Sequence, residues 1–241
     1  MSQLRRLLAE ALGSMLLAAT VIGSGIMAQR LAGGNAAVAL LANTGATVAV
    51  LAVLIALLGP VSGAHFNPAV SLVQALRRRL SVPEAVARIG AQVGGCIAGA
   101  ILAHAMFELP LIQSSMHVRA GAAQALAEFV ATFGLLLVIL GSRRSRDTPW
   151  MVAAWIGAAY WFTASTSFAN PAITIARSLT NTFSGIRPRD VPVFIAAQLL
   201  GALAAMVISR TLFSAPVSVA LPKEDAAQRI AADFHVVKDG G

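Results

Sequence analysis

Cysteine and charged residues are scarce in this chain. Its single cysteine, Cys96, excludes an internal disulfide and a cysteine-rich metal site. Only 12% of the 241 residues are charged, whereas 57% are hydrophobic and the mean hydropathy is +0.76. A soluble domain of this length would carry roughly twice that share of charged residues. The composition therefore indicates an integral membrane protein.

Acidic residues are few as well, ten against 18 basic ones, which leaves a net charge of +8. The basic residues lie in clusters between apolar stretches, as the topology signals of membrane proteins do, so we expect no nucleic-acid partner. The chain has no grouping of histidines, cysteines and carboxylates for a metal ion and no nucleophile paired with a base. We therefore expect no metal, no cofactor and no enzymatic activity.

Apolar stretches near the roughly 20 residues that a bilayer requires recur along the chain. We expect six transmembrane helices, at about 7–29, 36–58, 84–107, 121–141, 149–165 and 190–212. Most basic residues then fall on the side of the N-terminus, which predicts that both termini are cytoplasmic. Residues 1–215 would form the membrane domain and residues 216–241 a polar cytoplasmic tail.

The triplet Asn-Pro-Ala occurs twice, at Asn67-Pro68-Ala69 and at Asn170-Pro171-Ala172. Asn is a preferred N-cap and Pro a preferred first helical residue, so each triplet predicts the start of a helix. The helical patterns that follow, Pro68 to Arg79 and Pro171 to Phe183, are too short to cross a bilayer. We interpret them as re-entrant half-helices. Their unpaired N–H groups must face protein or a water-filled path, because lipid offers no partner.

An internal duplication relates the two halves of the membrane domain, about 1–107 and 121–215. Three residue pairs recur at similar spacing: Glu10 with Glu128, Asn67 with Asn170, and Gln92 with Gln198. Each half contains three spans, an odd number, so the second half must be inverted relative to the first. The predicted fold is an all-α membrane protein with six transmembrane helices and two half-helices in an inverted repeat.

These features resemble the aquaporin, or major intrinsic protein, family. The similarity is carried by the segment 63–70, by the second triplet, and by the paired Glu and Gln residues. The resemblance implies a homotetramer in which every subunit has its own pore. It also implies that Glu10 and Glu128 support the re-entrant loops, with Gln92 and Gln198 bracing the same loops or joining neighbouring helices. His65 has two interpretations, a structural hydrogen bond or a pH-sensitive gate.

The sequence departs from that family at the outer selectivity filter. Aquaporins usually carry an arginine directly after the second triplet, where this chain has Ile173, and its arginine comes four residues later as Arg177. The other filter positions are expected at Thr47, at Ser167, and at Ala158, with Ala159 or Tyr160 as alternatives to Ala158. A filter of Thr, Ala, Ser and Ile should be wider and less polar than a water filter, so it should admit more than water.

The predicted function is a passive channel in a bacterial inner membrane, with membrane lipid, water and small neutral solutes as partners. Asn67 and Asn170 would donate amide hydrogens to solutes such as glycerol-like polyols. Residues 168–178 resemble a bacterial branch of the family associated with arsenic resistance, which implies metalloid hydroxides such as arsenous acid as further solutes. Two alternatives remain. In the first, Arg177 forms the selectivity filter nearer the outer end of the pore, and the pore is water-selective. In the second, the protein is an ion-coupled secondary transporter.

Overall fold

The computed structural model describes residues 2–142 and 144–213, so the expected tail at 216–241 lies outside the described residues. In the described part every regular element is helical, which confirms the predicted fold class. The elements are α1 (Gln3–Leu31), α2 (Ala36–Ser62), α3 (Pro68–Leu76), α4 (Val82–Met106), α5 (Ala122–Gly141), α6 (Thr148–Phe162), α7 (Pro171–Arg177), the 3₁₀-helix η1 (Pro188–Asp190) and α8 (Val191–Leu212).

Five of the described helices are long and apolar enough to cross a membrane: α1, α2, α4, α5, and α8 together with η1. The expected span at 149–165 is the shorter helix α6, which has 15 residues. It ends early because Thr163 is already extended and the Thr166 N–H bonds to the Thr163 carbonyl, 3.1 Å away, in a turn. The span 163–166 thus belongs to the loop that leads to α7.

The two half-helices begin at the predicted residues and end sooner than predicted. Helix α3 ends at Leu76 instead of Arg79, because Arg78 is left-handed (φ 58°) and the Arg79 N–H closes back on the Gln74 carbonyl at 2.9 Å. Helix α7 ends at Arg177 instead of Phe183. The Arg177 carbonyl there accepts from the Ile186 N–H at 3.1 Å. This bond to the loop that follows, which the helical pattern does not contain, replaces the next turn of the helix.

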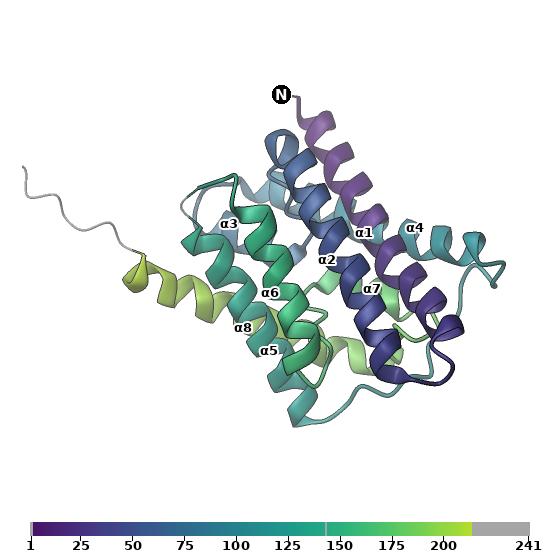
Figure 1. Cartoon of the computed structure of the whole chain (residues 1–241). Coiled ribbons are helices and arrows are strands. Elements are labelled where there is room, and N and C mark those ends of the chain that lie inside the picture. The colour runs from purple at the N-terminus through teal and green to yellow at the C-terminus, as the bar shows by residue number, and fades with distance from the viewer. Residues whose placement is uncertain (1, 143, 214–241) are drawn as a thin grey trace, which may run out of the picture.

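The helices form two halves of the same plan, α1 to α4 and α5 to α8, each with a half-helix before its last long helix. Helix α1 packs on α2 and α4, α5 packs on α6 and α8, and α2 and α6 join the halves (Figure 1). The half-helices cross over: α3 contacts α8 and α7 contacts α4. Each half-helix is thereby enclosed by long helices of both halves.

Glycines allow the closest helix crossings. A Cβ on Gly95 of α4 would overlap the Ala11 carbonyl of α1, and one on Gly99 would overlap the Met15 carbonyl. A Cβ on Gly201 of α8 would likewise overlap the Phe129 carbonyl of α5. Gly95 and Gly99 form a small-xxx-small pair, which lets two backbones approach inside a bilayer. The two crossings are equivalent in the repeat, since Gly95 and Gly201 have the spacing of Gln92 and Gln198.

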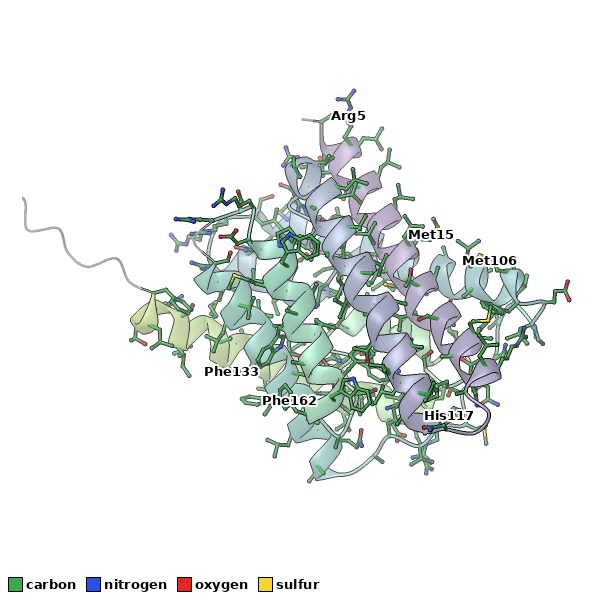
Figure 2. All side chains as sticks on the ribbon, in the orientation of Figure 1. Arg5, Met15, Met106, His117, Phe133 and Phe162 are labelled. Atoms are coloured by element: carbon green, nitrogen blue, oxygen red, sulfur yellow. The ribbon has the colours of Figure 1, made fainter. Side chains whose placement is uncertain are left out.

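Apolar side chains cover much of the outer surface. On α1, Leu4, Leu8 and Leu12 are 66%, 59% and 47% exposed at a spacing of four residues, so one face of the helix is a leucine stripe. Such a continuous exposed stripe fits lipid rather than water. Arg5 and His117 lie at opposite ends of the molecule, which marks the two polar ends (Figure 2).

Candidate pore

The N-termini of α3 and α7 meet at the centre of the molecule. The Asn67 Nδ2 donates to the Ala169 carbonyl at 2.7 Å, and the Asn170 Nδ2 donates to the Phe66 carbonyl at 2.8 Å. Each Asn Oδ1 caps its own half-helix by accepting from the N–H of the second residue after it, at 2.9 and 3.0 Å. Each triplet, although the two lie 103 residues apart in the sequence, is therefore bonded to the residue that directly precedes the other.

This junction changes one detail of the sequence-based interpretation. A capping Asn was expected to leave its whole amide nitrogen free for a solute, whereas each Nδ2 here gives one of its hydrogens to the opposite loop. An amide nitrogen carries two hydrogens, so one per asparagine is left to donate. The cross-bond also fixes the direction of that second hydrogen.

Glu10 of α1 binds the loop ahead of α3. Its Oε1 accepts from the His65 N–H at 3.0 Å and its Oε2 from the Phe66 N–H at 2.8 Å. The Gln92 Nε2 donates to the same Oε2 at 2.8 Å and to the Ser71 Oγ of α3 at 2.8 Å. The carboxylate is fully buried, and these charge-assisted bonds satisfy it there.

Glu128 of α5 repeats this arrangement for the loop ahead of α7. Its two oxygens accept from the Phe168 and Ala169 N–H groups at 2.8 and 2.9 Å. The Gln198 Nε2 donates to the Glu128 Oε2 at 2.6 Å and to the Thr174 Oγ1 at 2.9 Å. All four expected Glu and Gln residues thus contact the re-entrant segments.

The glutamates determine where the loop carbonyls point. Both loops contain several residues at positive φ, with φ 48° at Ala64 and Phe66 in the first and φ 59°, 49° and 47° at Thr166, Ser167 and Ala169 in the second. In a planar trans peptide the C=O points opposite to the N–H. Because the His65 and Phe66 N–H groups point to Glu10, the carbonyls of Ala64 and His65 point away from it. These residues line a cavity on that opposite side, so their carbonyls supply acceptors to it.

The surroundings of Glu10 and of Glu128 differ in charge. Glu10 also has Arg88 of α4, whose Nη1 lies 3.9 Å from its Oε1, and Arg88 in turn bonds Glu84 at 2.8 Å. The repeat places Phe194 at the position of Arg88 in the second half. His65 joins this first-half network through its Nδ1, which lies 3.0 Å from the Ser71 Oγ.

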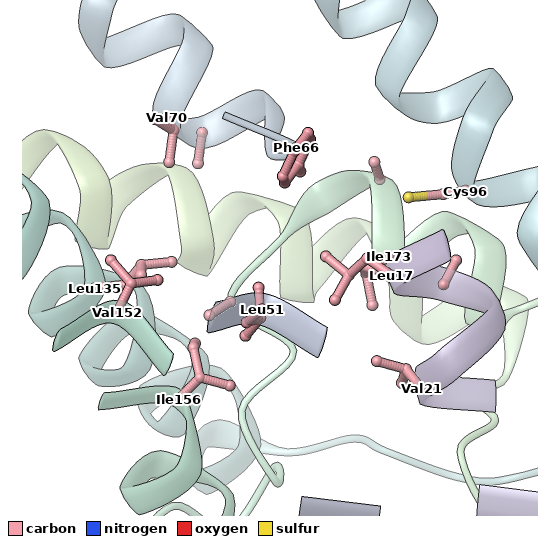
Figure 3. Packing of buried hydrophobic residues seen from close by; sticks show 14 of the residues in the cluster. Leu17, Val21, Leu51, Phe66, Val70, Cys96, Leu135, Val152, Ile156 and Ile173 are labelled. Atoms are coloured by element: carbon pink, nitrogen blue, oxygen red, sulfur yellow. The ribbon is translucent and has the colours of Figure 1, made fainter. Parts of the chain in front are cut away.

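A cavity of about 270 Å³ runs past both asparagines. Its lining consists of side chains from α1, α2, α5 and α6, most of them apolar, and of the loops with α3 and α7. In Figure 3 every labelled side chain except Cys96 belongs to this lining: Leu17, Val21, Leu51, Phe66, Val70, Leu135, Val152, Ile156 and Ile173. The expected polar residues on its wall are Thr47, His65, Asn67, Ser167, Asn170 and Arg177.

Of the residues expected for the filter position on the fifth spanning helix, α6, the alternative Tyr160 lines the cavity and Ala158 does not. Ala158 is exposed on the outer face of α6, whereas Tyr160 is 3% exposed, lines the cavity, and has its hydroxyl 3.3 Å from the Thr47 Oγ1. Two residues along a helix turn its face by about 200°, so only one of the two positions can point inward. A tyrosine on the cavity wall is bulkier and more polar than the alanine that was expected there.

Arg177 is held against an aromatic ring at one end of the cavity. It is 2% exposed, its guanidinium carbon lies 3.4 Å from the Phe168 ring centroid, and its Nε donates to the Ser184 carbonyl. Arg119, which the sequence analysis did not single out, lies 5.0 Å from the same ring and donates from Nη1 to the Ser165 carbonyl at 3.0 Å. Phe168 is thus contacted by two cations, an arrangement that local sequence does not reveal.

Three residues that line the cavity each have a buried side-chain atom without a protein partner: Gln74 Oε1, Ser167 Oγ and Arg177 Nη1. Buried polar groups are nearly always hydrogen-bonded, so these side chains have hydrogen-bonding capacity left for a molecule in the cavity. Arg177 offers a donor, Gln74 an acceptor and Ser167 either. The cavity is therefore suited to molecules that carry several hydroxyl groups.

Comparisons with known proteins agree with this fold. The family model for the major intrinsic proteins matches residues 1–164 and 148–237. The aquaglyceroporin AqpS of Rhizobium meliloti (strain 1021) is 60% identical over 210 residues, which cover 86% of this chain and 90% of that protein. Aquaporin NIP6-1 of Arabidopsis thaliana is 30% identical over 187 residues, 74% of this chain and 58% of that protein.

The fold also has a counterpart among solved structures. The X-ray structure of the aquaglyceroporin from Plasmodium falciparum superposes with a TM-score of 0.63 over 88% of this chain and 97% of that one. The two sequences are 20% identical, so this likeness concerns the fold. With two family matches that together extend over most of the sequence, the expected resemblance is confirmed. The chain belongs to the major intrinsic protein family.

Proposed function

We propose that this protein is a passive channel for small uncharged solutes, with water and glycerol-like polyols as permeants. One observation carries the proposal. A cavity is lined by both capping asparagines, and its wall combines apolar side chains with hydrogen-bonding groups. A polyol has matching chemistry, because its C–H groups can contact the apolar side chains while its hydroxyls exchange bonds with the polar groups.

The charges around the cavity disfavour cations. Two helix N-termini converge at its centre, and each carries a partial positive charge. Arg177 adds a buried guanidinium at one end. The Glu10 and Glu128 oxygens are occupied by loop N–H groups and glutamine amides. A cation in the cavity would therefore meet positive potential without a free carboxylate, whereas a neutral solute would not.

Tyr160 and Arg177 bear on the choice among neutral solutes. Together with Thr47 and Ser167 they give the wall donors and acceptors close to an aromatic ring, and Ile173 keeps one side apolar. The relative AqpS is named an aquaglyceroporin, which supports a polyol-permeable pore over a water-selective one. Compact hydroxides such as arsenous acid have the same several-hydroxyl chemistry, and we include them in the proposed substrate class.

We further propose that the protein is a homotetramer of the bacterial inner membrane with both termini cytoplasmic. The basic side chains at the end where α1 begins and α3 ends support this orientation, and the bacterial relative supports the compartment. Each subunit would keep its own pore, since the cavity is built within one chain. The cytoplasmic end of the pore is then the end near Gln74, and the outer end is the one near Arg177.

Purified protein in liposomes tests the channel. Stopped-flow light scattering should show faster water, glycerol and arsenous acid permeation than in empty vesicles, with no dependence on a proton or sodium gradient. No acceleration for any of the three solutes would refute the channel. Uphill uptake that needs an ion gradient would favour the secondary transporter instead.

The variant Arg177→Ala tests the filter. Loss of the guanidinium removes a donor and widens the outer end, so glycerol permeability should rise several-fold relative to water permeability. Arg189→Ala is the matched control, because Arg189 lies at the same end but is exposed and is not part of the cavity wall. An unchanged ratio in Arg177→Ala would show that Arg177 takes no part in selection.

A further inference from the structure

The inverted repeat pairs Arg177 with a residue of the other half. Asn67 and Asn170 are 103 residues apart, and the same spacing carries Arg177 back to Gln74. Both are the seventh residue after their capping asparagine. Seven residues are nearly two helical turns, so each side chain lies on the same face as its asparagine, about 10 Å further along. Gln74 and Arg177 thus occupy equivalent positions at opposite ends of the pore.

The two positions have features in common. Both residues line the one cavity, and each has a buried polar atom without a partner, Oε1 in Gln74 and Nη1 in Arg177. The residue two positions before each asparagine, His65 in one half and Phe168 in the other, also lines the cavity, and the Phe168 ring lies against the Arg177 guanidinium. The two side chains differ in chemistry, since Arg177 only donates, whereas the Gln74 amide has an oxygen that accepts.

Both apolar and polar side chains accompany Gln74 on the cavity wall. Val70 precedes it by one helical turn on the same face of α3, and Ile55 and Ile139 reach the cavity from the C-terminal parts of α2 and α5. His65 and Thr148 also line this cavity, and Gln74 borders a smaller pocket that is lined by Ser62, His65, Arg79 and Arg88. The Gln74 amide is therefore one of several hydrogen-bonding groups that a polyol would meet at this end, and it lies at the position that Arg177 has at the other.

We propose that Gln74 is a second selectivity position, a cytoplasmic counterpart of Arg177 that accepts a hydrogen bond from the hydroxyl group of a permeating solute. This inference rests on the proposed channel function and adds to it a specificity-determining residue at the end opposite the filter. Its effect is expected to be larger for polyols than for water. Water molecules in single file hydrogen-bond to one another, whereas the hydroxyl groups of a polyol depend on hydrogen bonds from the cavity wall.

Three variants of Gln74 test the proposal in liposomes. Gln74→Met is of similar length and has no acceptor of comparable strength, so the ratio of glycerol to water permeability should fall about threefold to tenfold, as loss of one hydrogen bond does. Gln74→Glu keeps an acceptor and should leave the ratio within about a factor of two, well inside that loss. Gln74→Leu replaces the Met variant if the latter does not insert. Gln3→Leu, at an exposed position at the start of α1, is the control.

The outcomes separate the two proposals. If the unmodified protein conducts neither solute, the channel function fails. If it conducts both and the Met or Leu variant has the ratio of the Gln3→Leu control, Gln74 is not a selectivity position and the channel function stands. A fall of the ratio in the Glu variant equal to that in the Met variant would also overturn the proposal, because the acceptor would then be irrelevant.

Discussion

At the scale of single residues, the pore depends on polar side chains that each serve two partners. Asn67 caps its half-helix with its oxygen and bonds the opposite loop with its nitrogen. Glu128 holds two consecutive N–H groups and a glutamine amide. Both loops contain residues at positive φ, which cost about 1–3 kcal/mol each when they are not glycine. The carboxylate bonds offset that strain and keep the loops in one conformation.

Replacing Glu128 by Gln should therefore weaken both the fold and the channel. The amide has one acceptor oxygen where the carboxylate has two, and its NH₂ group would face an N–H, so a buried donor loses its partner. We expect a loss of about 2–4 kcal/mol in the free energy of unfolding and little remaining water permeability. Thermal unfolding in detergent and stopped-flow measurements check this. Glu108→Gln, at an exposed loop position, should change neither.

Thiol reactivity distinguishes the cavity wall from the helix packing behind it. Cys96 is fully buried between α4 and α1, where its Sγ lies 3.6 Å from the Ser14 carbonyl, and it does not line the cavity. Mercuric chloride should therefore leave water permeability of the unmodified protein unchanged. Ile173→Cys places a thiol on the cavity wall, and the same treatment should block it reversibly by thiol addition. Inhibition of the unmodified protein would contradict the position of Cys96.

At the scale of helices, packing relies on close approach where glycine is present. The α1 and α4 backbones meet at Gly95 and Gly99, and α5 and α8 meet at Gly201. Apolar side chains alone give little driving force between helices in lipid, so close backbone contact contributes much of the association. The glutamates of α1 and α5 reach the loops only if these crossings hold their helices in place.

Gly95→Ala tests this crossing with a neighbouring glycine as its control. A methyl group at Gly95 overlaps the Ala11 carbonyl, so the helices must separate, at a cost of about 1–3 kcal/mol of stability. Gly94 is exposed, with no atom within 4 Å of an added Cβ. Gly94→Ala should leave stability unchanged or raise it by up to about 1 kcal/mol. Equal thermal stabilities of the two variants would refute the packing role of Gly95.

The sequence predicts the features of this fold that local rules control. The starts of α3 and α7 follow from the Asn-Pro pair, and the helical class follows from the apolar stretches. The ends of the half-helices do not, because the Arg177 carbonyl bonds to Ile186, a tertiary contact. The choice between Ala158 and Tyr160 depends on the length of the preceding loop, which the sequence pattern does not fix to within two residues. Tyr160 is the only tyrosine in the chain, which was the available signal.

At the scale of the whole molecule, the two polar ends are chemically distinct and accessible to labelling. Because Cys96 is buried, the unmodified protein should not react with a membrane-impermeant maleimide. His117→Cys, at the end that we assign to the outside, should be labelled in cells with a permeabilised outer membrane. Arg79→Cys, exposed at the other end, should be labelled only after the inner membrane is broken. The reverse pattern would invert the proposed orientation.

Oligomeric state is a second property at this scale. Light scattering of the purified protein, corrected for detergent, should give four copies of the 24.8 kDa chain. A monomer that still conducts water in liposomes would refute the homotetramer and leave the channel intact, since the cavity lies within one chain.

The bonds from Asn67 to the Ala169 carbonyl and from Asn170 to the Phe66 carbonyl bear on biosynthesis. During insertion the first three spans enter the bilayer before the second half has left the ribosome. Until then the first re-entrant loop has no partner for its Asn amide or its Phe66 carbonyl, so it cannot be locked in place. The two loops can therefore dock only after the second has been synthesised, whatever the order in which the spans are inserted.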